Sequence, residues 1–157
     1  MIVIDASVLV TALVDDGSDG RSVRGRLRGM ELAAPAHLDV EFLHALRGLV
    51  RSEQTSPARA DRAIAHLLRT PLRRVELPVV ASRTWQLRTN LPPYDAAYVA
   101  LAELLSAPLV TSDGRLARAT GPRCVIELIQ AGRADSGGDE VLLSRRMPDA
   151  AAPSCGC

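Results

Sequence analysis

The sequence contains few aromatic residues and no hydrophobic run long enough to cross a membrane. Aromatic residues make up 3% of the 157 residues, so a surface that stacks several single-stranded bases is not expected, although Trp85 or Tyr94 could contact one base. No apolar run approaches the roughly 18 residues of a membrane span. The first residues, MIVIDASVLV, contain an acid and lack a basic leader. We therefore expect a globular cytoplasmic protein without membrane contact.

Cysteine is scarce, and lysine is absent. Three cysteines cannot build the framework of a disulfide-rich scaffold. Cys124 lies in an apolar run that is typical of a core, whereas Cys155 and Cys157 form one pair of possible zinc ligands with no second pair to complete a tetrahedral site. The composition therefore excludes the small disulfide-rich class and gives little support to a zinc site.

The distribution of charge is more informative than the net charge of +1. The first 20 residues contain four aspartates and no base, whereas residues 21–28 contain four arginines and no acid. Arginine forms bidentate contacts with phosphate, so the arginine group (Arg21, Arg24, Arg26 and Arg28) is a candidate for phosphate binding. A solvated helix face explains the same pattern equally well, and both interpretations stay open.

Short apolar segments of strand length alternate with longer segments of helical periodicity. The expected strands lie at 1–4, 30–35, 73–77, 108–111 and 123–128, and the expected helices at 7–15, 20–28, 36–52, 57–69, 79–89 and 94–106. This alternation indicates βαβ units around a parallel sheet, which is an α/β fold. In the longest helix, Pro35 suits the first turn, and one apolar stripe follows the helical spacing: Leu38, Phe42, Leu46, Leu49 and Val50.

The composition changes after Gln130. Residues 1–130 carry the α/β pattern and are expected to form one domain, since 157 residues is a usual length for a single domain. Residues 131–157 are rich in glycine, serine, alanine, proline and charge, with one short apolar segment. We expect this second segment to be a flexible tail or a tail that docks on a partner.

Four acidic residues fall where they would meet at one edge of such a sheet. Asp5 directly follows the first strand, and Asp113 follows the fourth. Glu41 lies early in the helix after the second strand, and Asp95 lies in the first turn of the helix that leads to the fourth. In right-handed βαβ units, the carboxyl ends of the strands and the N-termini of the connecting helices share one edge. The topology therefore predicts a cluster of four carboxylates.

Each acid also has a purely structural interpretation. An aspartate in the first turn of a helix stabilises that helix by about 0.3–1 kcal/mol, which would explain Asp5, Asp95 and Asp113 singly. Two carboxylates about 4 Å apart repel by about 4 kcal/mol at the effective dielectric of a protein surface, so a cluster of four needs a cation or shared protons. Oxygen ligands without histidine or cysteine indicate Mg²⁺ or Mn²⁺, which typically acts on phosphate esters.

The residues around these acids resemble the ordered motifs of PIN-domain ribonucleases, and more narrowly those of the VapC-type toxins of bacterial toxin–antitoxin pairs. The resemblance extends over residues 1 to about 129, and the set of four motifs in this order is specific. The segments are VIDASVLV with Asp5, PAHLDVEFLHALRGLV with Glu41, YDAAYVALAE with Asp95 and LVTSDGRL with Asp113.

The resemblance implies a three-layer α/β/α sandwich with a five-stranded parallel sheet. It implies endonucleolytic cleavage of RNA by metal-activated water, a VapB-type antitoxin that blocks the acidic pocket, and a homodimer. The metal-binding and catalytic positions match Asp5, Glu41 and Asp95, with Asp113 as the more variable fourth position. Each of these expectations comes from the resemblance and is compared below with the structure.

Several neighbouring residues receive supporting interpretations. Ser7 and Thr111 match small hydroxyl positions that orient water or a carboxylate in the family. Asp39 is two residues from Glu41 and therefore points about 160° away on a helix, so only one of the two can face the pocket, and the resemblance to the family motif selects Glu41. His37 lies one turn before Glu41 on the same face of the helix and could touch substrate or metal, and a surface histidine is the favoured interpretation. Close helix packing, in the core or at a dimer interface, is expected around Tyr98, because four neighbouring residues are small: Ala96, Ala97, Ala100 and Ala102.

Three alternative functions are weighed against a nuclease. A phosphatase of the haloacid dehalogenase type also has an aspartate after its first strand, but it needs a second acid two residues later, where Ser7 stands. A receiver-type regulatory domain needs a lysine after its last strand, and the chain contains none. A PIN-fold binding module with little or no nuclease activity stays as the alternative, although the retention of all four acids disfavours it.

Overall fold

The structure, a computed structural model, describes residues 1–129. Its strands are β1 (Ile2–Ile4), β2 (Leu32–Pro35), β3 (Leu72–Val75), β4 (Leu109–Thr111) and β5 (Ile126–Leu128). Its helices are α1 (Ala6–Val14), α2 (Ser18–Leu27), α3 (Leu38–Arg51), α4 (Pro57–Arg69), α5 (Leu77–Gln86), α6 (Pro93–Leu104) and α7 (Gly114–Ala117). None of these helices is long and apolar enough to span a bilayer. The predicted tail, with Cys155 and Cys157, lies outside the described residues.

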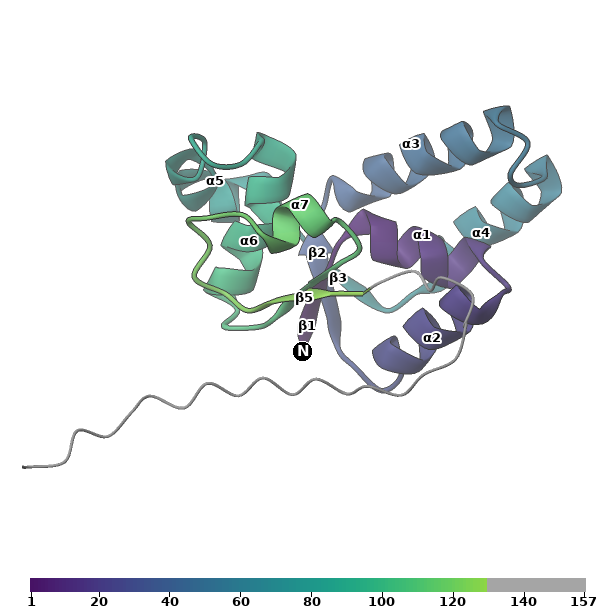
Figure 1. Cartoon of the computed structure of the whole chain (residues 1–157), viewed down its shortest axis with the longest axis horizontal. Helices are drawn as coiled ribbons and strands as arrows, with labels where there is room; N and C mark the ends of the chain where they lie inside the picture. Colours follow the sequence, from purple (N-terminus) through teal and green to yellow (C-terminus); the bar gives the residue numbers. More distant parts are fainter. Residues whose placement is uncertain (130–157) are drawn as a thin grey trace, which may run out of the picture.

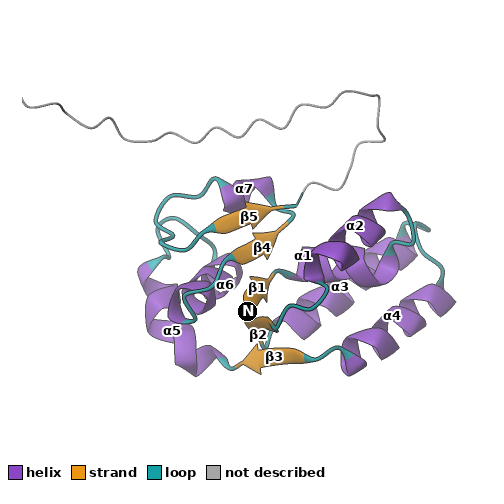
Figure 2. Ribbon diagram, turned by 90° about the horizontal axis from the view of Figure 1, so that it is seen from below, coloured by secondary structure: helices purple, strands orange, loops and turns teal. Residues whose placement is uncertain are grey.

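The five strands form one parallel sheet in the order β3-β2-β1-β4-β5 (Figure 1). Val3 at the centre of β1 is in register with Ala33 of β2 on one side and with Leu109 of β4 on the other. Figure 2 shows α5 and α6 on one face of the sheet and α1 to α4 on the other. The predicted three-layer α/β/α sandwich is therefore confirmed.

Every predicted strand and helix corresponds to an observed element, with ends that differ by a few residues. Helix α7 was not predicted, because four residues are too few to show helical periodicity. The placement of Pro35 in the first turn of the long helix was wrong, since Pro35 is the last residue of β2 and α3 begins at Leu38. A proline is tolerated there because the next N–H, that of Ala36, continues the ladder by donating to the Val75 carbonyl oxygen at 2.9 Å.

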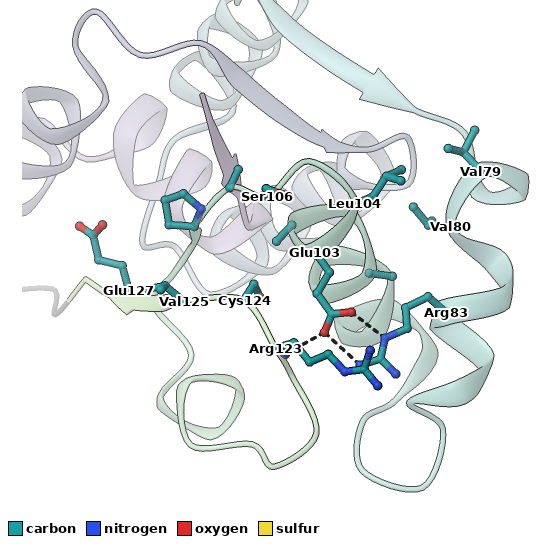
Figure 3. Close-up of a pocket in the computed structure, with 14 residues that line it drawn as sticks. Val79, Val80, Arg83, Glu103, Leu104, Ser106, Arg123, Cys124, Val125 and Glu127 are labelled. Atoms are coloured by element: carbon teal, nitrogen blue, oxygen red, sulfur yellow. Dashed lines mark hydrogen bonds and ion pairs between the residues drawn. The ribbon is translucent and has the colours of Figure 1, made fainter. Parts of the chain in front are cut away.

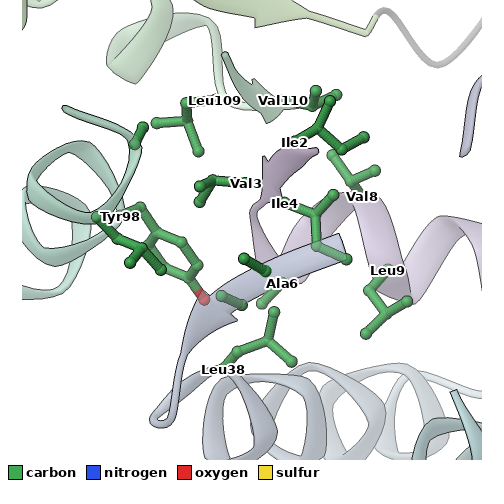
Figure 4. Close-up of a cluster of buried hydrophobic side chains, with 14 of the residues drawn as sticks. Ile2, Val3, Ile4, Ala6, Val8, Leu9, Leu38, Tyr98, Leu109 and Val110 are labelled. Atoms are coloured by element: carbon green, nitrogen blue, oxygen red, sulfur yellow. The ribbon is translucent and has the colours of Figure 1, made fainter. Parts of the chain in front are cut away.

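The centre of the sheet forms the core. The side chains of β1 and β4 are at most 1% exposed, which is typical of parallel strands covered by helices on both faces. Figure 4 shows Tyr98 of α6, Leu38 of α3 and Leu9 of α1 packed around β1. These contacts fix the N-terminal turns of α3 and α6 against the carboxyl end of β1. Those two turns carry the predicted acids Glu41 and Asp95.

The alanines of α6 belong to the core of the single chain. Ala96, Ala97, Ala100 and Ala102 are at most 2% exposed. Their small side chains bring the helix backbone close to the sheet. Of the two alternatives left open for this alanine-rich face, core packing is therefore the correct one, and these residues are not available for a dimer interface.

Candidate active site at the carboxyl edge of the sheet

The chain topology explains why the four acids lie at one edge. From the neighbouring central strands β1 and β4, the chain winds outward in opposite directions, through β2 to β3 and to β5. Asp5 follows β1 and caps α1, and Asp113 lies just after β4 and caps α7. Glu41 and Asp95 lie in the first turns of α3 and α6. Ligands of open α/β sheets bind at such a reversal of winding.

The charges of the other three acids act on Asp95. Burial raises the pKa of the Asp95 carboxyl above its ordinary value, and the negative charges of Asp5, Asp113 and Glu41 raise it further. The guanidinium of Arg115 acts in the opposite direction with a smaller effect. This mutual repulsion agrees with the placement of the four acids at one edge of the sheet.

Both oxygens of Asp5 are held by neighbouring groups. Its Oδ1 accepts a hydrogen bond from the backbone N–H of Ser7 at 3.1 Å, and its Oδ2 accepts one from the Thr111 hydroxyl. Thr111 is fully buried, and its Oγ1 in turn accepts the backbone N–H of Asp113 at 3.0 Å. The Ser7 hydroxyl accepts the N–H of Ser112 at 3.3 Å. The segments after β1 and β4 are therefore tied together through Ser7 and Thr111.

Glu41 is held by a buried tyrosine from the facing helix. The Tyr98 hydroxyl donates to Oε2 of Glu41 at 2.5 Å. Burial and the Glu41 carboxylate raise the pKa of Tyr98, so the phenol stays protonated and serves as a donor. This hydrogen bond joins α3 to α6 directly beneath the acidic cluster.

His37 is not the surface residue that the sequence suggested. Its side chain is 23% exposed, and its Nε2 is buried without a hydrogen-bond partner, 3.8 Å from Oε2 of Glu41. The ring packs edge-on against Tyr94 and Tyr98, with ring centres 5.6 and 5.2 Å away. Contact with two aromatic rings explains why the imidazole is drawn inward toward Glu41.

Asp113 and Asp39 both pair with arginines. Asp113 accepts the backbone N–H of Arg115 at 2.7 Å and pairs with its guanidinium at 2.8 Å, which lowers the pKa of the Asp113 carboxyl. Asp39 forms a two-point ion pair with Arg74, at 2.6 and 2.9 Å. Asp39 is therefore turned toward β3, as the helix periodicity predicted, and Glu41 is the acid of α3 that faces the cluster.

Three of the four residues in the arginine group have side-chain partners within the chain. The Arg24 guanidinium donates to the carbonyl oxygens of Ala12 and Asp15 at 2.8 and 2.7 Å, so it binds the end of α1. Arg26 forms a two-point ion pair with Glu127 of β5, and Arg21 donates to the carbonyl oxygen of Asp16. These contacts favour a structural role for the three arginines over phosphate binding.

The structure contains a cavity of about 930 Å³, whose lining residues are drawn in Figure 3. Its lining includes Pro108 and Val125, which precede β4 and β5, so it opens at the opposite edge of the sheet. Glu103 lies within it and accepts hydrogen bonds from Arg83 at 2.6 Å and from the Arg123 N–H at 2.8 Å. None of the four acids lines this cavity. The ion pair between Arg83 and Glu103 joins α5 to α6, and the hydrogen bond from the Arg123 N–H fastens the segment before β5 to α6.

The donor atoms of the acidic cluster fit a hard divalent cation, because they are carboxylate and hydroxyl oxygens. As the side chains stand in residues 1–129, no group of three or more His, Cys, Asp or Glu is arranged to hold a metal ion directly. The contacts of Glu41 with Tyr98 and of Asp113 with Arg115 occupy oxygens that would otherwise be free. Direct ligation by three carboxylates would therefore require side-chain rotation, whereas ligation through retained water, which Mg²⁺ favours, would not.

Comparison with known proteins identifies the family. The model of the PIN domain family matches residues 2–122. The chain is also 42% identical over 129 residues to ribonuclease VapC12 of Mycobacterium tuberculosis, an alignment that covers 82% of this chain and 99% of the relative. The chain belongs to the VapC-type PIN-domain family. The resemblance noted in the sequence is thus confirmed.

Solved structures agree with this VapC-type fold. PAE2754 from Pyrobaculum aerophilum superimposes with a TM-score of 0.59 at 23% identity, covering 81% of this chain and 83% of the other. VapBC2 from Rickettsia felis, solved bound to a DNA fragment from its promoter, gives a TM-score of 0.58 at 14% identity, covering 82% and 98%. At these identities the comparisons support the fold alone.

Two residues other than the predicted acids lie beside Glu41 in this VapC-type chain. The spacing placed His37 on the same face as Glu41, four residues before it, but the contact of Tyr98 with Glu41 was not predicted. Residues three or four apart share one face of a helix, so the spacing could also have placed Tyr98 on the face of Asp95. Their roles depend on how α3 faces α6, which is a matter of tertiary packing and not of spacing.

Proposed function

We propose that this protein is a metal-dependent endoribonuclease and the toxin of a toxin–antitoxin pair. The observation that carries the proposal is the convergence of Asp5, Glu41, Asp95 and Asp113 at the carboxyl edge of the sheet, where burial and the charges of the other three acids raise the pKa of Asp95. Membership of the VapC-type family and 42% identity to a ribonuclease support the same conclusion. The reaction is hydrolysis of an RNA phosphodiester by an activated water.

In this proposal, Asp5, Glu41 and Asp95 hold one or more Mg²⁺ ions, directly or through water, and Asp113 completes the site. Mn²⁺ has similar ligand preferences and can substitute. When bound, such an ion lowers the pKa of a coordinated water and offsets the negative charge that develops on the phosphate oxygens. A cation at this position would also relieve the repulsion among the four carboxylates.

Neighbouring residues of the protein position the carboxylate oxygens of the cluster. Thr111 and the backbone N–H of Ser7 fix the two oxygens of Asp5, and Tyr98 fixes one oxygen of Glu41. A carboxylate of the cluster accepts the proton of the attacking water. The products are a 5′-phosphate and a 3′-hydroxyl. Fixed carboxylates cost no reorganisation during the reaction, which is how preorganised polar groups accelerate it.

The partners are part of the same proposal. Because a solved structure from Klebsiella pneumoniae that resembles this chain is a toxin–antitoxin complex, we propose that a VapB-type antitoxin inhibits this protein by covering the acidic cluster. We further propose that the toxin acts in the cytoplasm, where its RNA substrate is, and that it forms a homodimer. Co-expression with a candidate antitoxin, followed by measurement of the molar mass of the complex, tests both associations.

Removal of divalent cations is expected to abolish cleavage. The purified protein is incubated with total RNA in the presence of Mg²⁺ or of a chelator, and the ends of the fragments are mapped. We expect discrete cuts with 5′-phosphates only when Mg²⁺ is present, because the four carboxylates alone repel both hydroxide and phosphate. If no RNA is cut under either condition, the PIN-fold binding module becomes the better description.

Thr111→Val is expected to reduce both activity and stability. The substitution keeps the volume of the buried side chain but removes the donor to Asp5 and the acceptor for the Asp113 N–H. An unpaired buried N–H costs about 1–3 kcal/mol, and the loss of a partner that orients a metal ligand typically lowers activity about 10–100-fold. Urea unfolding and the rate of RNA cleavage measure the two effects.

Thr111→Ser is the matched control, because it retains the hydroxyl. It should keep most of the activity and lose only the packing of one methyl group. Equal activity of the valine variant and the wild type would show that the hydroxyl of Thr111 does not position Asp5.

A further inference from the structure

A second cavity, of about 540 Å³, lies beside the acidic cluster. Its walls include Ala36 and Glu76, the residues that directly follow β2 and β3, and Leu77 and Pro93, the residues that begin α5 and α6. The cavity therefore opens at the same carboxyl edge of the sheet as the four acids. Its volume lies within the range of about 300–1,000 Å³ that is usual for small-molecule sites.

Two residues connect the cavity to the acids. His37 lines the cavity, while its Nε2 lies 3.8 Å from Oε2 of Glu41. Tyr94 also lines it and directly precedes Asp95 in the chain. A group bound in the cavity would thus be the immediate neighbour of a group bound at the acids.

The exposed aromatic rings of the protein gather at this cavity. The chain contains one tryptophan, two tyrosines and one phenylalanine, of which Phe42 and Tyr98 are buried in the core. The other two, Trp85 and Tyr94, are 67% and 63% exposed and both line the cavity. Aromatic rings left in water at a concave site are typical of ligand binding, and their flat faces suit a flat ligand.

Charged groups complete the lining. The Arg88 guanidinium carbon lies 4.9 Å from the centre of the Trp85 ring, and the same side chain donates to the Trp85 carbonyl oxygen at 3.0 Å. Arg88 thus restrains the ring and brings a positive charge to the rim. Glu76 lines the opposite wall, at the start of α5, and makes no capping hydrogen bond with its side chain. Its carboxylate can accept a hydrogen bond from the amino group of a base.

We propose that this cavity binds one unpaired nucleobase of the RNA, stacked on Trp85 or Tyr94, next to the phosphodiester held at the acids. The inference rests on the proposed ribonuclease function and adds to it a subsite that selects single-stranded RNA. A nucleotide offers an amino group to Glu76 and a phosphate to Arg88.

Trp85 is the only tryptophan of the chain, so its fluorescence reports directly on the cavity. The full-length Asp5→Asn variant, which binds without cutting, is titrated with a short single-stranded RNA that spans a mapped cleavage site. We expect saturable quenching by this RNA and little quenching by the same RNA with abasic residues on both sides of the cleaved bond. Fluorescence that changes instead with protein concentration in the absence of RNA would show a second copy covering Trp85 and would overturn the proposal.

Cleavage kinetics provide an independent test. Trp85→Ala should raise the KM for the intact RNA about 10-fold, in line with the loss of one base–aromatic stack, and should not change the cleavage of the abasic RNA. Trp85→Phe retains a ring and should restore most of the lost affinity. Val79→Ala is the matched control, because Val79 is an exposed apolar residue of the same helix that lies outside this cavity.

The outcomes separate this inference from the proposed function. Absence of RNA cleavage by the wild type would overturn the ribonuclease proposal. Normal cleavage by the wild type, together with unchanged cleavage of both RNAs by Trp85→Ala, would overturn the nucleobase subsite alone.

Discussion

Asp5→Asn is expected to lower the rate of RNA cleavage on the order of 1,000-fold, which corresponds to about 4 kcal/mol of transition-state stabilisation. Asp5 lies at the centre of the sheet edge, and both of its oxygens are oriented by hydrogen bonds. Asparagine removes the negative charge and one of the two oxygens. The amide still provides an acceptor for the Ser7 N–H, and asparagine is as good a helix N-cap as aspartate, so α1 should remain intact.

The matched control is Asp39→Asn. Asp39 is an acid two residues from Glu41 on the same helix, but its side chain pairs with Arg74. This variant should retain cleavage close to the wild-type rate and lose only the partly exposed ion pair, which is worth up to about 1 kcal/mol. Circular dichroism and urea unfolding verify that both variants are folded. If Asp39→Asn lost as much activity as Asp5→Asn, Asp39 would belong to the active site, and the assignment of Glu41 alone from α3 would be wrong.

The acidic cluster could be predicted from the sequence because it depends on chain order alone. In a parallel sheet, a residue that directly follows a strand lies at the carboxyl edge whatever the packing details, and this holds for Asp5 after β1 and Asp113 after β4. The choice of Glu41 over Asp39 came instead from the family motif, because periodicity showed only that one of the two can face the pocket. The predictions for Asp5 and Asp113 needed only the elements and their order, which were correct to within a few residues.

The nucleobase cavity could not be predicted, because it depends on contacts between distant segments. Trp85 and Tyr94 are nine residues apart and belong to different helices. Only the packing of α5 against α6 brings their rings to one cavity with Ala36 and His37. A low aromatic content argued against base stacking, but composition does not show whether the few rings present lie together.

The arginine group of α2 illustrates the same limit. Four arginines within residues 21–28 are compatible with phosphate binding, and the sequence offered no means to decide. In the structure, Arg26 reaches Glu127, a residue 101 positions away. This long-range ion pair links α2 to the edge strand β5, so Arg26 has a structural partner and is not a free binding residue.

Asp95→Asn is expected to abolish cleavage and, in the absence of metal, to raise the melting temperature by a few degrees at neutral pH. The pKa of Asp95 is raised in the folded state, from an ordinary value of 3.8, by burial and by the other acids. Between the ordinary and the raised value, the folded state binds a proton that the unfolded state does not, so the free energy of unfolding falls as pH rises through this window. At neutral pH the cost of the buried charge is fully present, and asparagine removes it.

Melting temperatures measured in chelator from about pH 4 to 7, with 3.8 as the ordinary value, test this prediction. The wild type should lose stability relative to Asp95→Asn as the pH rises, and Mg²⁺ should raise the melting temperature of the wild type more than that of the variant, because only a ligand that prefers the folded state stabilises it. An aspartate that served only to cap α6 would give the opposite result at pH 7, since its removal would cost about 0.3–1 kcal/mol. The sign of the change in melting temperature therefore distinguishes an aspartate that only caps α6 from one that is repelled by three other carboxylates and needs a cation to balance its charge.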